Sequence, residues 1–165
     1  MRVTALNIYP LKGGRAVSVE RAQLAARGFD DDRRWLVVDA DGKFVTQRSH
    51  PRIATITARP TADGLNLSAP GAVDLSIARP TGRERIEVAV WTDRVSAALA
   101  DERAHSWLSA VFGERLMLVH MDERTLRMKT GPWVTTAIPL SFADAFPVLV
   151  TTTASLADLN AEIAR

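Results

Sequence analysis

Short apolar runs separated by turn residues fill the first hundred positions, and this spacing most constrains the fold. Asp41-Gly42, Asp63-Gly64 and Pro70-Gly71 lie between such runs, and glycine after aspartate or proline is typical of tight turns between strands. Many short strands with regular turn signals are typical of a barrel or a sandwich. We expect strands near 3–8, 17–24, 35–38, 43–46, 53–58, 65–67, 73–77 and 86–91.

The pattern changes to a helical one near Asp101. Apolar residues recur at helical spacing up to Phe112, and Gly113 is placed as a C-cap. A strand is expected at 115–120, a loop at 122–137 and another strand at 146–151. Ser155 is expected to cap a second helix that carries Leu156, Leu159 and Ile163. The fold class is therefore mainly β (α+β), a small β-barrel with one or two peripheral helices.

The composition limits the function classes. The chain is 47% hydrophobic and 24% charged, as in ordinary globular proteins, and it has no cysteine, which excludes disulfides, thiolate metal sites and a cysteine nucleophile. No apolar run approaches the ~20 residues of a membrane span, and no signal peptide is evident. We therefore expect a cytoplasmic protein without a membrane partner.

Neither the net charge nor the known catalytic motifs point to a particular function. The net charge is +2 and the pI about 9.5, which is weak evidence for a nucleic-acid partner because few groups titrate between these pH values. His50, His105 and His120 do not have the spacing of a metal site. We predict no metal ligands and no catalytic residues. A buried set is expected on alternating strand positions, at Trp35, Val37, Phe44, Ile53, Ile56, Val88 and Val90.

Four polar segments remain as candidates for a binding site. The first, Tyr9-Pro10-Leu11-Lys12-Gly13-Gly14, delivers a lysine to a glycine turn whose backbone N–H groups can hold an anion. The others are 30–35, with three aspartates before two arginines, 46–52, a polar strand end, and 141–147, which places Asp144 in an apolar stretch.

The order of these segments resembles the N-terminal β-barrel domain of MOSC-domain proteins. The matching stretches include YPLKGG at 9–14, RGFDDDRRWLVVDADGKFVTQR at 27–48 and FADAFPVLVTTTASLADLN at 142–160. The resemblance implies a barrel domain over 1–121, and a linker with the first elements of a MOSC domain over 122–165. The second helix runs into Arg165 without a stop signal, so we expect a truncated chain; a frayed terminal helix is the alternative.

The resemblance also implies a molybdopterin-type molybdenum cofactor, as in the family's oxidoreductases and sulfur carriers. Lys12 and Arg33 map to the family's phosphate-binding lysine and arginine, Gly13 can offer its backbone N–H, and Asp144 maps to a family aspartate. Arg48 completes the expected cofactor-binding set. The family holds molybdenum by a cysteine from the second half of the MOSC domain, which this chain lacks. We therefore expect a chain that is inactive alone and whose partner is that missing half; a protein that never carries molybdenum is the alternative.

Two other functions stay open at this stage. Lys12, Arg33 and Arg48 could instead form the mouth of a free-standing binding module for an anionic small molecule, without catalysis. A nucleic-acid-binding barrel needs exposed aromatic residues among basic ones, whereas Trp35, Trp91 and Trp107 lie in apolar runs typical of a core. Finally, segment 142–160 is expected to expose Phe142, Phe146, Leu156 and Leu159 and to mediate self-association.

Overall fold

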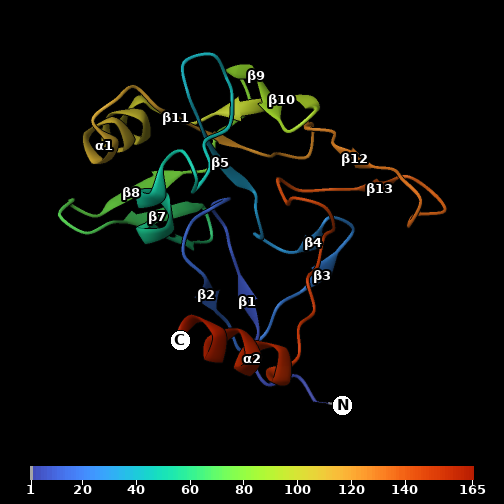
Figure 1. The fold of residues 1–165 in the computed structure, drawn as a ribbon. Helices are drawn as coiled ribbons and strands as arrows, with labels where there is room; N and C mark the ends of the chain where they lie inside the picture. Colours follow the sequence, from blue (N-terminus) through green and yellow to red (C-terminus); the bar gives the residue numbers. More distant parts are fainter. Residues whose placement is uncertain (1) are drawn as a thin grey trace.

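Strand β5 (Trp35–Val38) lies at the centre of a computed structural model that describes residues 2–165 (Figure 1). All four of its residues are buried, so the apolar run has no solvent-facing side. β5 pairs antiparallel with β11 (Met117–His120), with Trp35 opposite His120. The remaining strands of this sheet follow in the order β5-β11-β10-β9, where β9 is Arg85–Val90 and β10 is Asp93–Leu99.

A second sheet curls around the same core. It has the order β6-β7-β8, formed by β6 (Thr57–Pro60), β7 (Gly64–Ser68) and β8 (Leu75–Ala78). Three two-stranded pairs complete the strands: β1 (Asn7–Ile8) with β2 (Val17–Ser18), β3 (Leu24–Ala25) with β4 (Gly28–Phe29), and β12 (Met128–Lys129) with β13 (Ile138–Pro139). The mainly β class is confirmed, with the strands arranged as a curled half-barrel (Figure 1).

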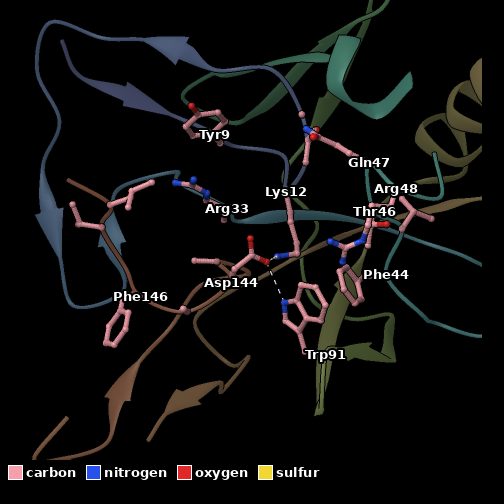
Figure 2. Close-up of a pocket in the computed structure, with 17 residues that line it drawn as sticks. Tyr9, Lys12, Arg33, Phe44, Thr46, Gln47, Arg48, Trp91, Asp144 and Phe146 are labelled. Atoms are coloured by element: carbon pink, nitrogen blue, oxygen red, sulfur yellow. Dashed lines mark hydrogen bonds and ion pairs between the residues drawn. The ribbon is translucent and has the colours of Figure 1, made fainter. Parts of the chain in front are cut away.

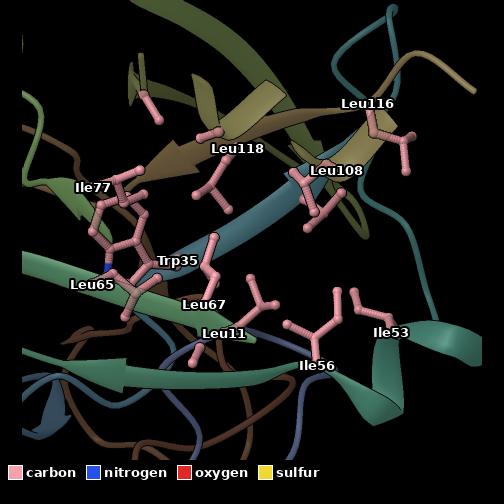
Figure 3. Packing of buried hydrophobic residues seen from close by; sticks show 14 of the residues in the cluster. Leu11, Trp35, Ile53, Ile56, Leu65, Leu67, Ile77, Leu108, Leu116 and Leu118 are labelled. Carbon is pink, nitrogen blue, oxygen red and sulfur yellow. The ribbon is translucent and has the colours of Figure 1, made fainter. Parts of the chain in front are cut away.

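Helix α1 (Glu102–Phe112) begins and ends as its sequence predicts. The side chain of Asp101 accepts a hydrogen bond from Ala104 N, and Gly113 ends the helix in the left-handed conformation at φ 78°. These caps satisfy backbone groups that the helix itself leaves unpaired. The inner face of α1 packs on the core through Leu108 (Figure 3).

Most of the predicted interior residues are buried. Trp35, Val37, Ile53, Ile56, Val88 and Val90 are at most 1% exposed. Phe44 is only half-buried. The predicted strand at 53–58 is wrong at its start, because Pro51–Thr55 forms a 3-10 helix, η1, with proline in its first turn.

The C-terminal segment differs from expectation in three ways. Phe142 is fully buried against the β9-β10-β11 sheet, because its backbone N–H is tied to Arg33 O at 2.9 Å; it is not an exposed residue. No strand forms at 146–151. Helix α2 (Thr153–Ile163) is capped by Thr152, whose hydroxyl accepts from Ser155 N at 3.0 Å, so the predicted Ser155 cap is wrong.

Helix α2 has no buried residue. Leu156 and Leu159 are exposed, as is Phe146 before the helix, in agreement with the sequence-based expectation for these three side chains. Among residues 2–165, no helix is long and apolar enough to cross a membrane.

Candidate functional site

An open cavity of about 530 Å³ brings together all five predicted site residues (Figure 2). Its volume lies within the range of small-molecule sites. The lining comes from the turn at 9–14, Arg33, the loop at 44–48, Trp91 and the segment 143–149. Lys12, Gly13, Arg33, Arg48 and Asp144 therefore share one cavity, while their role as ligands of an anion stays a prediction.

A short backbone ladder explains why Lys12 and Arg33 converge. Residues 9–12 run beside the start of β5: Arg33 N donates to Tyr9 O at 2.9 Å, Trp35 N to Pro10 O at 3.0 Å and Lys12 N to Trp35 O at 2.9 Å. Leu11, between them, is 1% exposed and anchors the segment in the core. The ladder delivers both cationic side chains to the same edge of the half-barrel.

The Gly13-Gly14 turn next to Lys12 is conformationally demanding. Gly13 has φ 79°, a region that residues with a Cβ rarely adopt. A Cβ on Gly14 would lie 3.1 Å from the Cβ of Leu11 and 3.2 Å from Ile56 O. The Gln47 side chain holds the turn by donating to Gly13 O at 2.9 Å. Within residues 2–165 no acceptor is found for Gly13 N–H.

Lys12 is buried although it is charged. Only 7% of the residue is exposed, and its Nζ donates to Asp144 Oδ1 at 2.5 Å and to Phe142 O at 2.8 Å. Burial lowers the pKa of Lys12, an effect that the Asp144 carboxylate opposes and that the charges of Arg127 and Arg33 reinforce. A buried ammonium held in one geometry is suited to bind an anion from one side.

Asp144 is the acceptor of this arrangement. Besides Lys12 it receives a hydrogen bond from Trp91 Nε1 at 3.1 Å (Figure 2). Burial alone would raise the pKa of Asp144, but the hydrogen bonds from Lys12 and Trp91 and the charges of Lys12 and Arg33 together lower it. The carboxylate is thus held in its ionised form.

Arg33 has two neighbours that fix its guanidinium. It forms an ion pair with the buried Asp32, whose other oxygen accepts a hydrogen bond from Tyr9 N at 2.7 Å. Its Cζ also lies 4.4 Å from the centre of the Tyr9 ring. Stacking on an aromatic face leaves the outer edge of a guanidinium free to bind a planar or anionic group.

Trp91 is a site residue that sequence reasoning placed in the core. It is 50% exposed and lines the cavity, with its ring 5.0 Å from that of Phe44 and 5.8 Å from Arg48 Cζ. Trp91 and Arg33 also have positive φ, at 57° and 49°. Residues other than glycine rarely adopt this conformation, and they do so preferentially at functional sites.

Arg127, which no motif singled out, holds the outer wall of the cavity. Its guanidinium is buried and donates to Ser141 O at 2.8 Å, Ala143 O at 2.6 Å and Asp93 Oδ2 at 2.7 Å. The first two bonds fix the irregular segment that carries Asp144. The only hint of its role in the sequence is that Arg127 lies in a stretch, 124–143, without an acidic residue that could pair with it locally.

A second cavity of about 440 Å³ lies beside the turn that carries Asp30 and Asp31. His120 is 4% exposed there, packs 4.6 Å from the Trp35 ring, and its Nδ1 has no hydrogen-bond partner within residues 2–165. The surrounding acids are largely paired, with Asp31 on Arg79, Glu123 on Arg34 and Asp122 on Arg85. In the described part of the chain no cluster of three or more histidine and acidic side chains could hold a metal.

Comparison with known proteins decides the family. The model of the MOSC N-terminal beta barrel domain matches residues 1–115. The chain belongs to this family. The match covers more than half of the chain and includes Lys12, Gly13, Arg33 and Arg48, whereas Asp144 lies beyond it.

The relatives of this MOSC chain carry two kinds of name. Mitochondrial amidoxime-reducing component 1 of Mus musculus is 32% identical over 99% of the chain and 51% of the relative, and that of Xenopus laevis is 28% identical over 98% and 50%. The molybdenum cofactor sulfurase of Homo sapiens is 28% identical over 98% of the chain and 19% of the relative. The chain spans about half the length of the amidoxime-reducing relatives.

Among the solved structures similar to this chain is the solution structure of a Bordetella bronchiseptica protein, with 22% sequence identity and a TM-score of 0.49, covering 63% of this chain and 90% of that one.

Proposed function

We propose that this chain forms the barrel side of the cleft for a molybdopterin-type molybdenum cofactor in a MOSC protein. The observation that carries the proposal is the convergence of Lys12, Arg33 and Arg48 on one cavity. A phosphate needs cationic donors at short range, and two arginines with a buried lysine supply them. The names of the relatives support the choice of cofactor at the level of the family.

The donor set fits the anionic part of such a cofactor. Lys12 and Arg33 are held by neighbouring groups, and Gly13 offers a backbone N–H without a partner in the described chain. The Trp91 and Phe44 rings provide an aromatic wall beside the cations, suited to a planar ring system. In this proposal Arg48, which is exposed at the rim, closes the site over the phosphate.

When bound, the cofactor supplies the redox or sulfur-transfer chemistry, and the residues of this chain bind and orient it. The chain has no cysteine, so it offers no thiolate to a molybdenum ion. We propose that the thiolate comes from a C-terminal MOSC half and that the 165-residue chain is inactive alone. We also propose that residues 1–121 form the barrel domain and 122–165 lead into that half.

Lys12→Gln tests the site directly. We expect the variant to bind pyrophosphate roughly ten- to a hundredfold more weakly, because one charge-assisted hydrogen bond is lost. The measurement is titration calorimetry of the whole chain with pyrophosphate. The matched control is Lys43→Gln, which removes an exposed lysine outside the cavity and should leave the affinity unchanged.

A second measurement separates the proposal from its alternative. The chain is expressed in cells that make the cofactor, purified and oxidised, and its fluorescent pterin product is quantified. Pterin retained by the parent chain and lost in Lys12→Gln supports the cofactor cleft. Pyrophosphate binding without any retained pterin would favour a free-standing module for anionic small molecules. Equal affinity of Lys12→Gln and the parent chain would contradict both.

Self-association stays a proposal as well. Three apolar side chains are exposed here: Phe146 at the cleft wall, and Leu156 and Leu159 on α2. A second copy of the chain could bury them symmetrically. We expect a sedimentation mass above that of the monomer for the parent chain and a monomer for Leu156→Ser with Leu159→Ser. A monomeric parent chain would contradict this.

We also propose a cytoplasmic location for this chain.

A further inference from the structure

Asp144 is a carboxylate in a cavity whose other charged side chains are cations. Lys12, Arg33 and Arg48 line the same space. A second negative charge beside Asp144 would be repelled at short range, which disfavours the carboxylate as a direct ligand of an ionised phosphate oxygen. Its role has to be sought in the groups that it contacts.

Those contacts join two functional side chains from different parts of the fold. Asp144 Oδ1 accepts from Lys12 Nζ at 2.5 Å and from Trp91 Nε1 at 3.1 Å. Lys12 lies in the turn after β1, and Trp91 lies at the turn between β9 and β10 (Figure 2). A single oxygen therefore fixes the ammonium and the indole relative to each other.

Trp91 needs such a support. It is half exposed and has φ 57°, so neither burial nor an ordinary backbone conformation fixes its ring. The hydrogen bond to Asp144 determines which way the indole edge points, and the ring then packs in an edge-type arrangement with Phe44, with 5.0 Å between the two ring centres. The aromatic wall of the cavity thus depends on the carboxylate.

Lys12 needs it for a different reason. The charges of Arg33 and Arg127 act on its ammonium, which lies 5.5 Å from the centre of the Phe44 ring and 5.9 Å from that of Trp91, and Asp32 is already paired with Arg33. Asp144 is the carboxylate that contacts it in the described chain. Without that negative charge, burial beside two guanidinium groups disfavours the charged form of the amine.

We propose that Asp144 is a positioning residue that holds the Lys12 ammonium and the Trp91 indole, and that it acts on an anion in the cavity only through them. The inference rests on the proposed function, since it names how that same cleft keeps its positive charge and its aromatic wall. It differs from a ligand role because the carboxylate keeps its two contacts whether or not an anion is present.

The test uses the whole chain and two variants. Asp144→Asn keeps an oxygen that can accept from Trp91 but removes the negative charge, and Asp144→Ala removes both contacts. The chain contains three lysines and four tryptophans, so lysine Cε and indole N–H resonances can be followed individually by NMR. Asp158→Asn, an exposed carboxylate on α2, is the matched control.

We expect the Lys12 signal to titrate at lower pH in both Asp144 variants than in the parent chain. The Trp91 indole N–H should keep its position in Asp144→Asn and move toward that of a solvated indole in Asp144→Ala. The Lys43 signal should not move in either variant, and Asp158→Asn should leave all three lysine signals unchanged. Lys12 and Trp91 signals that stay at their parent positions in Asp144→Ala would overturn the proposal.

Pyrophosphate titration of the same variants distinguishes the two proposals. At pH values where Lys12 is protonated in every variant, Asp144→Asn should bind pyrophosphate as tightly as the parent chain or more tightly, because a repulsive charge is gone. Weaker binding in Asp144→Asn while the Lys12 and Trp91 signals stay at their parent positions would make Asp144 a ligand and overturn the positioning role. If the parent chain binds neither pyrophosphate nor the pterin, the proposed function fails, while the NMR signals still decide the positioning role.

Discussion

Replacing Arg127 by methionine is expected to lower the free energy of unfolding by about 3 kcal/mol, the lower end of what breaking a buried ion pair costs. Arg127 is 5% exposed, and its guanidinium donates to Asp93 and to the carbonyls of Ser141 and Ala143. Methionine fills similar space but donates nothing, so two carbonyls and a carboxylate lose their partner. Asp93 is partly solvated, which moderates the loss.

The measurement is urea unfolding of the parent chain and the variant, together with hydrogen exchange of the Leu140 and Phe142 amides, which donate to Arg127 O and Arg33 O. Exchange of these amides should rise at urea concentrations well below the unfolding midpoint, since the wall loses its attachment before the core opens. Arg94→Met is the matched control: Arg94 makes an exposed ion pair with Glu87, and its loss should cost less than about 1 kcal/mol. Equal effects of the two substitutions would contradict the role given to Arg127.

Acidification from pH 6.5 to pH 4 is expected to lower the free energy of unfolding by about 3 kcal/mol through His120 alone. Burial, with the charges of Arg34 and Arg79, lowers the pKa of His120 to about 4. In the unfolded chain the imidazole takes up a proton near pH 6.5, whereas in the folded chain it stays neutral until about pH 4. Protonation therefore favours the unfolded chain in this window, and stability falls as the pH falls.

His120→Phe provides the check, because phenylalanine can pack on Trp35 and does not titrate. Unfolding by urea at several pH values between 7 and 4 should give a flatter profile for the variant. Although burial acts to raise it, hydrogen bonds from Arg85 and Thr125 lower the pKa of Asp122 to about 2. The stability that depends on Asp122 is lost only below about pH 4, outside the window. A parent-like slope in His120→Phe would show that His120 is not the cause.

Sequence reasoning predicted the interior better than the edges. Trp35, Val37 and Val88 lie on strands whose apolar side chains can be buried only in the core. The pattern of apolar residues along the chain was therefore sufficient to predict their burial. Trp91 failed because its apolar neighbours belong to β9, while the residue itself turns out of the sheet at a positive φ. Nothing in a hydrophobic pattern reports such a local backbone reversal.

The C-terminal segment shows a second limit. Residues 146–151 are as apolar as a strand, yet no strand forms: Gly28 of β4 packs closely against Pro147, but no ladder of backbone hydrogen bonds joins this segment to a strand in the described chain. Phe142, a few residues earlier, is buried since Arg33 O and Arg127 fix its backbone. The family resemblance predicted the five residues that line one cavity. Arg127 belongs to no motif, so its role became visible only in the structure.

The contact between Lys12 and Asp144 joins residues that are 132 positions apart. Closing so long a loop costs entropy that only a nearly complete fold can offset, so contacts of this separation form late. During synthesis Asp144 leaves the ribosome long after the barrel strands that carry Lys12 and Arg33. An anion that bound only the assembled cleft would stabilise the folded form over partly folded forms in which the Lys12–Asp144 contact is absent.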